Sequence, residues 1–189
     1  RTYFHHLPET ICFLLAQAKT SIRAAVCWFS HTEIFETLTA RLHAGVKVEL
    51  LMEYDSQNIR DGGLDFQSFI RNGGHLYAYQ EPGLMHHKFA LIDNLLLLTG
   101  SFNWTRNSNA ENLLSTEDAG AVADFQQEFE QQRVAALRIF KVRKEDVKLF
   151  SAFPLFENTR FHLPDLRKKV SSGAGVWRAR LDKLGVDKA

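Results

Sequence analysis

The order of the apolar segments near the start of this 189-residue chain restricts its fold more than any other feature. Residues 21–29 (SIRAAVCWF) are a β-prone apolar run, residues 32–44 have helical periodicity, and residues 46–52 (VKVELLM) alternate as a second strand. A strand, a helix and a second strand in this order predict a right-handed crossover between two parallel strands. We therefore expect an α/β domain.

The remaining segments complete an α/β/α layered domain with a mixed central sheet and a small helical extension at the C-terminal end. Ser30-His31-Thr32-Glu33 has the form of a capping box, which predicts the start of the second helix. The long helix has apolar residues at helical spacing up to Val134 and Leu137. The predicted helices cover residues 7–19, 32–44, 64–71 and 119–140, and the further predicted strands cover residues 75–79, 88–93, 95–99 and 111–116.

One segment combines residues that suit phosphate chemistry. Residues 85–112 read MHHKFALIDNLLLLTGSFNWTRNSNAEN, with the spacing His-x-Lys-x4-Asp-x6-Gly-Ser-x-Asn. Side chains two positions apart share one face of a strand, so His86 and Lys88 point the same way. The imidazole of His86 can attack phosphorus, Lys88 and Asn103 can hold the non-bridging oxygens, and Gly100 lets the backbone approach closely. This pattern predicts a site for phosphodiester cleavage.

These residues resemble the HKD motif of the phospholipase D superfamily. Residues 6–118 are similar to its small single-motif members, the Nuc-type bacterial endonucleases and the Zucchini-type (mitochondrial cardiolipin hydrolase-like) proteins, and the phrases MHHKFALID, LLLTGSFNWT and AENLL are closest to the Zucchini-type pattern. The resemblance implies a phospholipase D-like fold. It also implies a phosphodiesterase that uses neither metal nor other cofactor and works as a homodimer through a phosphohistidine intermediate.

The resemblance assigns roles to six positions. His86 matches the nucleophile, Lys88 and Asn103 the phosphate ligands, Ser101 a supporting hydroxyl and Glu111 the acid that orients a histidine. Asp93 matches the motif aspartate and is grouped with the catalytic residues, although its role in the family is more structural than chemical. The chain holds one copy of the motif, and one histidine cannot both attack phosphorus and protonate the leaving oxygen, so we expect the second histidine from a twofold-related chain.

Several other residues are weaker candidates. Trp104 is a candidate to stack on a base at the rim of the site, with a buried core aromatic as the alternative. Polar residues follow the second strand, where open α/β sheets usually bind ligands, but each reads more readily as part of a polar loop. His87 is expected to face away from His86. The candidates after the second strand are Glu53, Tyr54, Asp55 and Arg60, and residues 80–84 are a candidate rim loop.

Metal binding is not predicted. Zucchini-type proteins carry a zinc-binding insertion rich in Cys and His, whereas this chain has only Cys12 and Cys27, which lack the close spacing of metal ligands. Both fall in apolar segments and read as core residues. Two such cysteines give no disulfide framework, which favours a reducing compartment, so we expect a cytoplasmic location. An N-terminal signal or membrane anchor ahead of Arg1 is left open as an alternative.

Charge divides the chain into two parts. Residues 1–140, the expected catalytic domain, hold 11 Lys and Arg against 16 Asp and Glu, whereas residues 141–189, the expected helical extension, hold 12 against 6. A basic tail can bind a nucleic-acid backbone or an anionic membrane surface, or be a solvated helical extension.

Three functions fit these observations. The first is a sequence-nonspecific endonuclease acting on DNA or RNA, with a single-stranded substrate favoured. The alternative is hydrolysis of an anionic phospholipid such as cardiolipin, for which the same residues would serve. The third is a non-catalytic nucleic-acid-binding protein that retains the fold, and the intact His86, Lys88, Asn103 and Glu111 argue against it.

Overall fold

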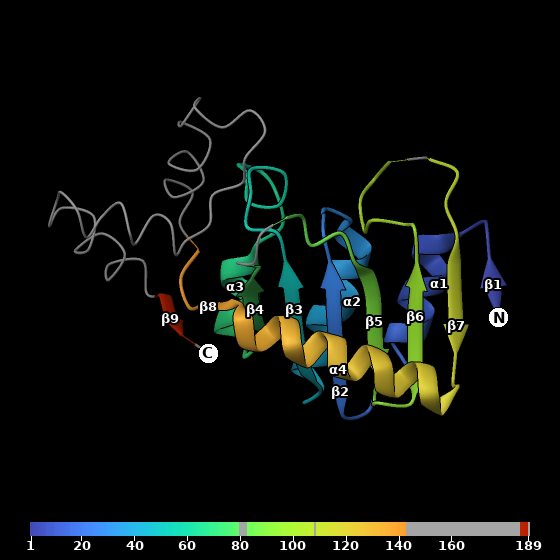
Figure 1. The fold of residues 1–189 in the computed structure, drawn as a ribbon. Coiled ribbons are helices and arrows are strands. Elements are labelled where there is room, and N and C mark those ends of the chain that lie inside the picture. Colours follow the sequence, from blue (N-terminus) through green and yellow to red (C-terminus); the bar gives the residue numbers. More distant parts are fainter. Residues whose placement is uncertain (80–82, 108, 143–185, 189) are drawn as a thin grey trace, which may run out of the picture.

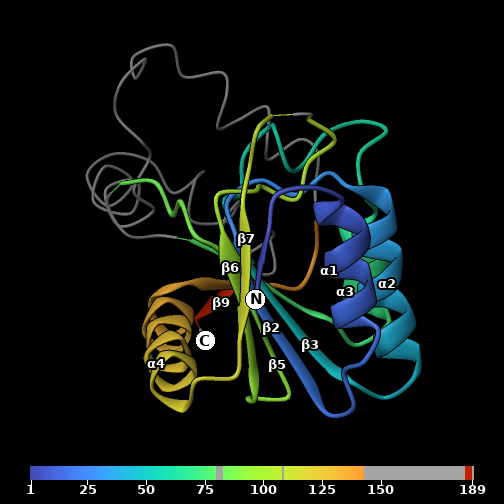
Figure 2. The same ribbon diagram turned by 90° about the vertical axis from the view of Figure 1, so that its right-hand side faces the viewer.

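A computed structural model gives the fold, and it describes residues 1–79, 83–107, 109–142 and 186–188. A central mixed sheet has the strand order β1-β7-β6-β5-β2-β3-β4-β8-β9. Three helices cover one face and α4 covers the other, as the two views in Figures 1 and 2 show. The predicted α/β/α arrangement with a mixed sheet is therefore confirmed.

The element bounds follow the predicted segments closely, with some ends shorter by a few residues. The helices are α1 (Leu7–Leu15), α2 (Thr32–His43), α3 (Phe66–Arg71) and α4 (Ala119–Ala135). The strands are β1 (Thr2–Tyr3), β2 (Ser21–Val26), β3 (Lys47–Met52), β4 (His75–Ala78), β5 (Lys88–Ile92), β6 (Leu96–Gly100), β7 (Leu113–Thr116), β8 (Leu137–Ile139) and β9 (Val186–Lys188).

Strand direction determines which residues meet at each edge of the sheet. β2 runs parallel to β3 and antiparallel to β5, with Val26 opposite Lys88. β5, β6 and β7 form an antiparallel meander in which Gly100 is opposite Leu113. The ends of β2, β3 and β6 therefore lie at the same edge as the starts of β5 and β7. We call this the motif edge, and the opposite one, where Ser21 and Lys47 are paired, the anchor edge.

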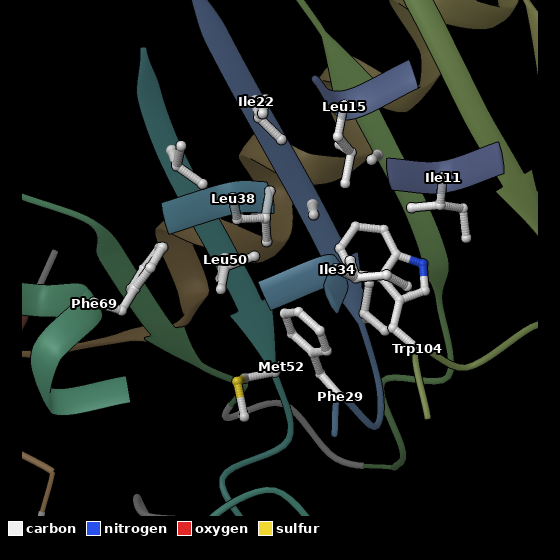
Figure 3. Packing of buried hydrophobic residues seen from close by; sticks show 14 of the residues in the cluster. Ile11, Leu15, Ile22, Phe29, Ile34, Leu38, Leu50, Met52, Phe69 and Trp104 are labelled. Atoms are coloured by element: carbon white, nitrogen blue, oxygen red, sulfur yellow. The ribbon is translucent and has the colours of Figure 1, made fainter. Parts of the chain in front are cut away.

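Two hydrophobic clusters lie on the two faces of the sheet. The larger one lies under α1, α2 and α3 and includes Ile11, Ile34 and Phe69, all fully buried (Figure 3). The smaller one lies under α4, where Phe129 and Phe89 pack. Alternation along the central strands sends neighbouring side chains to opposite clusters, which fixes the strand register.

One local prediction was wrong, and one strand was missed. No side-chain cap opens α2: His31 is its N-cap residue, and Ser30 uses its backbone N–H to bond the Trp104 carbonyl (2.7 Å), so the predicted capping box does not form. β1, which pairs with β7, was not predicted, since two residues carry too little pattern.

The long helix is shorter than predicted. α4 ends at Ala135, and Leu137–Ile139 form β8, antiparallel to β4. Leu137 and Ile139 alternate with Arg138 and are buried, whereas Val134 is 62% exposed. The alternation of a strand therefore begins where the helical spacing was extended too far.

Only part of the predicted tail can be compared with the structure. Val186–Lys188 form β9, which pairs antiparallel with β8, so this piece of the predicted helical extension is a strand. The helix predicted after Pro164, like most of residues 141–189, lies outside the described residues. No helix in the described parts of the chain has the length and apolar character needed to cross a membrane.

Candidate active site

Lys88 is a buried cation at the start of β5. It is 7% exposed, and its Nζ donates a hydrogen bond to the backbone carbonyl of His86 (2.6 Å). Burial lowers the pKa of Lys88, while nearby Cys27 and Glu111 act in the opposite direction. An ammonium has three donors, so the His86 carbonyl leaves two that can bind a phosphate oxygen. The Lys88 side chain thus folds back onto the backbone of His86, which lies two residues before β5 begins.

Asn103 reaches the same edge from the turn after β6. Its Oδ1 accepts a hydrogen bond from the backbone N–H of Trp28 (3.4 Å), the second residue after β2. Because the amide oxygen faces Trp28, the amide nitrogen is the end of Asn103 that can donate to a phosphate oxygen. The pairing of Val26 with Lys88 places this contact next to the start of β5.

Ser101 and Glu111 form a supporting pair. The hydroxyl of Ser101 donates to the Glu111 carboxylate, and the same Oγ accepts from the backbone N–H of Asn112 (3.0 Å). The β6–β7 pairing brings these residues together, and Glu111 also lies near enough to Lys88 to affect its pKa. The Glu111 carboxylate therefore accepts a hydrogen bond from Ser101 and also attracts the charge of Lys88.

Gly100 is required for a different reason from the one expected. A Cβ at this position would overlap the backbone carbonyl oxygen of Asn112 on the neighbouring chain segment. The close approach that glycine permits is thus between β6 and the segment before β7. It holds Ser101 beside Glu111 and gives no evidence of backbone contact with a phosphate.

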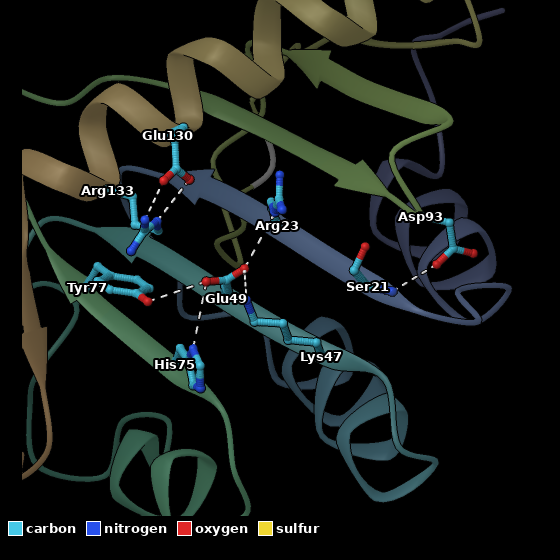
Figure 4. Close-up of polar contacts among 9 residues, drawn as sticks. All are labelled: Ser21, Arg23, Lys47, Glu49, His75, Tyr77, Asp93, Glu130 and Arg133. Carbon is cyan, nitrogen blue, oxygen red and sulfur yellow. Dashed lines mark hydrogen bonds and ion pairs between the residues drawn. The ribbon is translucent and has the colours of Figure 1, made fainter. Parts of the chain in front are cut away.

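Asp93 lies at the anchor edge, at the far end of β5 from Lys88 (Figure 4). Its carboxylate accepts hydrogen bonds from the backbone N–H groups of Lys19, Thr20 and Ser21 and from the Thr20 hydroxyl, at 2.7 to 3.1 Å. Burial opposes ionisation, but these hydrogen bonds prevail and lower the pKa of Asp93 to about 2. Five residue steps along the chain place it about 16 Å from Lys88. Grouping Asp93 with the catalytic residues was wrong, and the structural role implied for the motif aspartate fits.

Trp104 is a core residue, so its assignment to substrate binding was wrong. It is 2% exposed and its ring packs against Phe29 in a T-shaped arrangement, with centroids 5.2 Å apart (Figure 3). Its carbonyl accepts from Ser30 and His31. The backbone carbonyl of Trp104 links the turn after β6 to the segment after β2.

The polar residues after β3 mainly organise their own loop. Glu53 Oε1 accepts from the backbone N–H of Met85 (2.8 Å), and Asp55 Oδ1 accepts from that of Asn58 (3.0 Å). Tyr54 packs partly against the larger core. Arg60 lines a cavity of about 630 Å³ between α2 and α3. Residues 80–82 of the predicted rim loop lie outside the described residues.

His87 takes the role predicted for it. Its Nε2 lies 2.9 Å from Glu128 Oε1 on α4, and its ring contacts Phe89. It therefore faces the α4 side of the sheet.

Two residues of the motif edge escaped sequence reasoning. The ring of Trp28 makes a T-shaped contact with the His86 imidazole, with centroids 5.8 Å apart and planes at 79°. Asn58 is 2% exposed and joins the loop after β3 to the segment after β2. One signal could have identified Trp28 as a candidate. It follows the carboxyl end of a parallel strand, where open α/β sheets usually bind ligands.

Potential metal ligands do not cluster in the described part of the chain: no group of three or more His, Cys, Asp or Glu residues there could hold a metal ion. Cys27 is buried and Cys12 half-buried, as expected for core residues.

A mixed sheet that brings a histidine, a buried lysine and an asparagine to one edge defines the phospholipase D class of domain. The family model described as "Cardiolipin synthase, PLD-like domain" matches residues 11–133, and the chain belongs to this family. The resemblance inferred from the motif is thus confirmed.

Curated relatives carry names of hydrolases. Mitochondrial cardiolipin hydrolase of Chlamydomonas reinhardtii is 32% identical over 133 residues, which are 67% of this chain and 59% of that protein. The Homo sapiens protein of the same name is 33% identical over 120 residues, which are 61% of this chain and 46% of that protein. The chain thus spans about half the length of these relatives.

Solved structures confirm the fold. Nuc from Salmonella typhimurium, described as a phospholipase D family member, superposes with a TM-score of 0.67 at 20% identity, covering 75% of this chain and 97% of that one. NucT from Helicobacter pylori gives a TM-score of 0.63 at 18% identity, covering 72% and 96%.

Proposed function

We propose that this protein is a metal-independent phosphodiesterase that cleaves DNA or RNA as a sequence-nonspecific endonuclease. The observation that carries the proposal is the position of His86, Lys88 and Asn103 at one sheet edge, where they can supply a nucleophile and two donors for phosphate oxygens. Membership of the phospholipase D-like family supports the reaction class.

The proposed reaction has two steps. A ring nitrogen of His86 attacks phosphorus, and the bond from phosphorus to the leaving oxygen breaks as a second histidine protonates that oxygen. That histidine then takes a proton from water, whose oxygen attacks phosphorus and breaks the phosphorus–nitrogen bond. Lys88 and Asn103 hold the non-bridging oxygens throughout.

The second histidine is proposed to be His86 of a twofold-related copy, because the chain has one motif. One imidazole must then be neutral while the other is protonated, so activity is expected to have a bell-shaped pH profile. Sedimentation equilibrium is expected to give a dimer. A monomer with full activity would contradict this part of the proposal.

A nucleic acid is favoured as substrate by the distribution of positive charge. Residues 141–189 carry an excess of Lys and Arg. Cations beyond the reacting phosphate suit a polymer with a phosphate at every residue.

Hydrolysis of an anionic phospholipid such as cardiolipin is the second candidate, because the curated relatives carry the name cardiolipin hydrolase. The two candidates share every proposed catalytic residue. Liposomes containing cardiolipin and single-stranded oligonucleotides, tested side by side, separate them. Release of phosphatidic acid without oligonucleotide cleavage would favour the lipid.

The test uses the full chain with labelled single- and double-stranded DNA and RNA in excess EDTA. Cleavage is expected with wild-type protein and loss of at least about 10³-fold with His86→Asn. Cleavage that EDTA abolishes, or that His86→Asn leaves unchanged, would overturn the proposal. Binding without any cleavage by the wild type would favour the non-catalytic alternative.

A further inference from the structure

Trp28 contributes an aromatic ring contact to His86. Its ring is partly exposed and makes the T-shaped contact with the imidazole described above. Such aromatic pairs have a preferred geometry and contribute about 0.5–1.5 kcal/mol beyond burial. The contact restricts how the imidazole can turn.

The indole ring is itself held from the other side. Its Nε1–H donates to Asp55 Oδ2 (3.2 Å), while the second oxygen of Asp55 accepts from the backbone N–H groups of Gln57 and Asn58, both at 3.0 Å. The carboxylate is therefore fixed by its own loop, and it fixes the ring of Trp28 in turn.

The backbone around Trp28 is fixed on both sides. Asn58 donates to the Cys27 carbonyl (2.7 Å) and accepts from the Phe29 N–H (2.7 Å). The Cys27 N–H donates to the His87 carbonyl (3.0 Å), and the Trp28 N–H donates to Asn103. One residue thus contacts the proposed nucleophile through its ring and a proposed phosphate ligand through its backbone.

We propose that Trp28, oriented by Asp55, is a positioning residue that sets the plane of the His86 imidazole relative to Asn103. The inference rests on the proposed function, in which His86 attacks phosphorus. Misplacement of a reacting group by about 1 Å can lower the rate about 100-fold, far more than the packing energy of the ring alone suggests. Trp104, also an aromatic at the motif edge but 2% exposed and packed on Phe29, is the matched structural control.

The kinetic test compares Trp28→Ala, Trp28→Phe, Asp55→Ala and Trp104→Phe in the full chain. Trp28→Ala is expected to lower kcat about 10- to 100-fold with KM within about threefold of wild type. Trp28→Phe keeps a ring beside His86 and is expected to recover most of the loss. Trp104→Phe is expected to lower the melting temperature and leave kcat, measured well below it, unchanged.

Two kinetic outcomes would overturn the inference. One is a kcat within twofold of wild type for Trp28→Ala. The other is a raised KM with unchanged kcat, which would make Trp28 a substrate-stacking platform instead.

A measurement without substrate separates this inference from the proposed function. The imidazole Cε1–Hε1 NMR signal of His86, assigned by its loss in His86→Asn, is compared between wild type and Asp55→Ala, which retains the indole ring but removes its hydrogen-bond acceptor. A shifted or doubled signal supports the positioning role even if no substrate is cleaved. An unchanged signal would overturn it.

Discussion

Each of the two edges of the central sheet carries a charged residue, and the two residues have different surroundings. At the anchor edge Asp93 accepts hydrogen bonds from three backbone N–H groups and a hydroxyl. At the motif edge Lys88 is buried and donates to a neutral carbonyl, and within the part of the chain that the structure describes it forms no salt bridge. Its pKa is lowered by burial, whereas that of Asp93 falls because hydrogen bonds favour its charged form.

A second carboxylate on the anchor-edge half of the sheet repeats the pattern. Glu49 of β3 is 3% exposed, and Lys47, Arg23 and His75 lie within 2.9 to 3.7 Å of it (Figure 4). Burial opposes its ionisation, but the contacts with Lys47 and Arg23 keep its pKa below the usual value. Asp93 and Glu49, which each have several polar partners, stabilise the fold. Lys88 has fewer partners and remains able to bind a phosphate.

After the loss of His86 itself, the largest expected effect comes from removing the motif-edge cation. Lys88→Met keeps much of the side-chain volume, and we expect kcat to fall about 10²- to 10³-fold because a donor to the developing charge is lost. The matched variant Lys47→Met removes an anchor-edge cation and should leave kcat unchanged. Steady-state kinetics on both variants test this, and equal losses would remove the distinction between the two edges.

Asp93→Asn should affect stability and leave catalysis intact. It removes a charge that accepts several hydrogen bonds, so we expect unfolding free energy at pH 7 to fall by about 2 kcal/mol. Because the pKa of Asp93 is lowered from 3.8 to about 2, its contribution is complete above pH 3.8 and is lost as pH falls toward 2.

Urea denaturation of Asp93→Asn and wild type across this acidic range gives the measurement. The stability difference between them should narrow as pH falls. A stability difference that does not change with pH would contradict the assigned role of Asp93. A large loss of kcat with unchanged stability would indicate a catalytic role.

Ser101 and Glu111 should act as a unit. Ser101→Ala and Glu111→Ala each remove the hydrogen bond between them, and we expect each to lower kcat about tenfold. The double variant should lose much less than the product of the two, which a double-mutant cycle measures. Fully multiplicative losses would mean that the two residues act independently.

The smallest effect is expected for Glu49→Gln. Its cationic partners are partly exposed, so the loss of stability should be about 1 kcal/mol and should shrink at high salt. Thermal unfolding at two salt concentrations tests this. Activity should be unaffected, and a loss of activity would show that the two edges are coupled.

Sequence patterns predicted those parts of the molecule that depend on periodicity or on residue spacing. The crossover from β2 to β3, the helices on both faces and the position of Lys88 in β5 all follow from alternation and strand order. The strand at Leu137–Ile139 was not predicted, because three residues fit a helix or a strand equally well. Their pairing with β4 is what makes them a strand.

Contacts that join distant segments could not be read from the sequence. The ring of Trp28 lies against His86 because the segment after β2 is tied to Asn58, and the burial of Trp104 depends on Phe29. The two tryptophans have similar local sequence settings near strand ends. Only their tertiary partners distinguish the one beside the imidazole from the one in the core.

The most direct test of the central claim is to trap the covalent intermediate at the motif edge. Wild-type protein is mixed with substrate in excess EDTA, quenched in alkali, where phosphohistidine survives, and analysed by mass spectrometry. The account predicts a covalent adduct on His86, in which the phosphoryl group still carries the non-leaving part of the substrate, with none in His86→Asn and less in Lys88→Met. Substrate turnover with this adduct on another residue, or with no covalent adduct at any quench time, would contradict it.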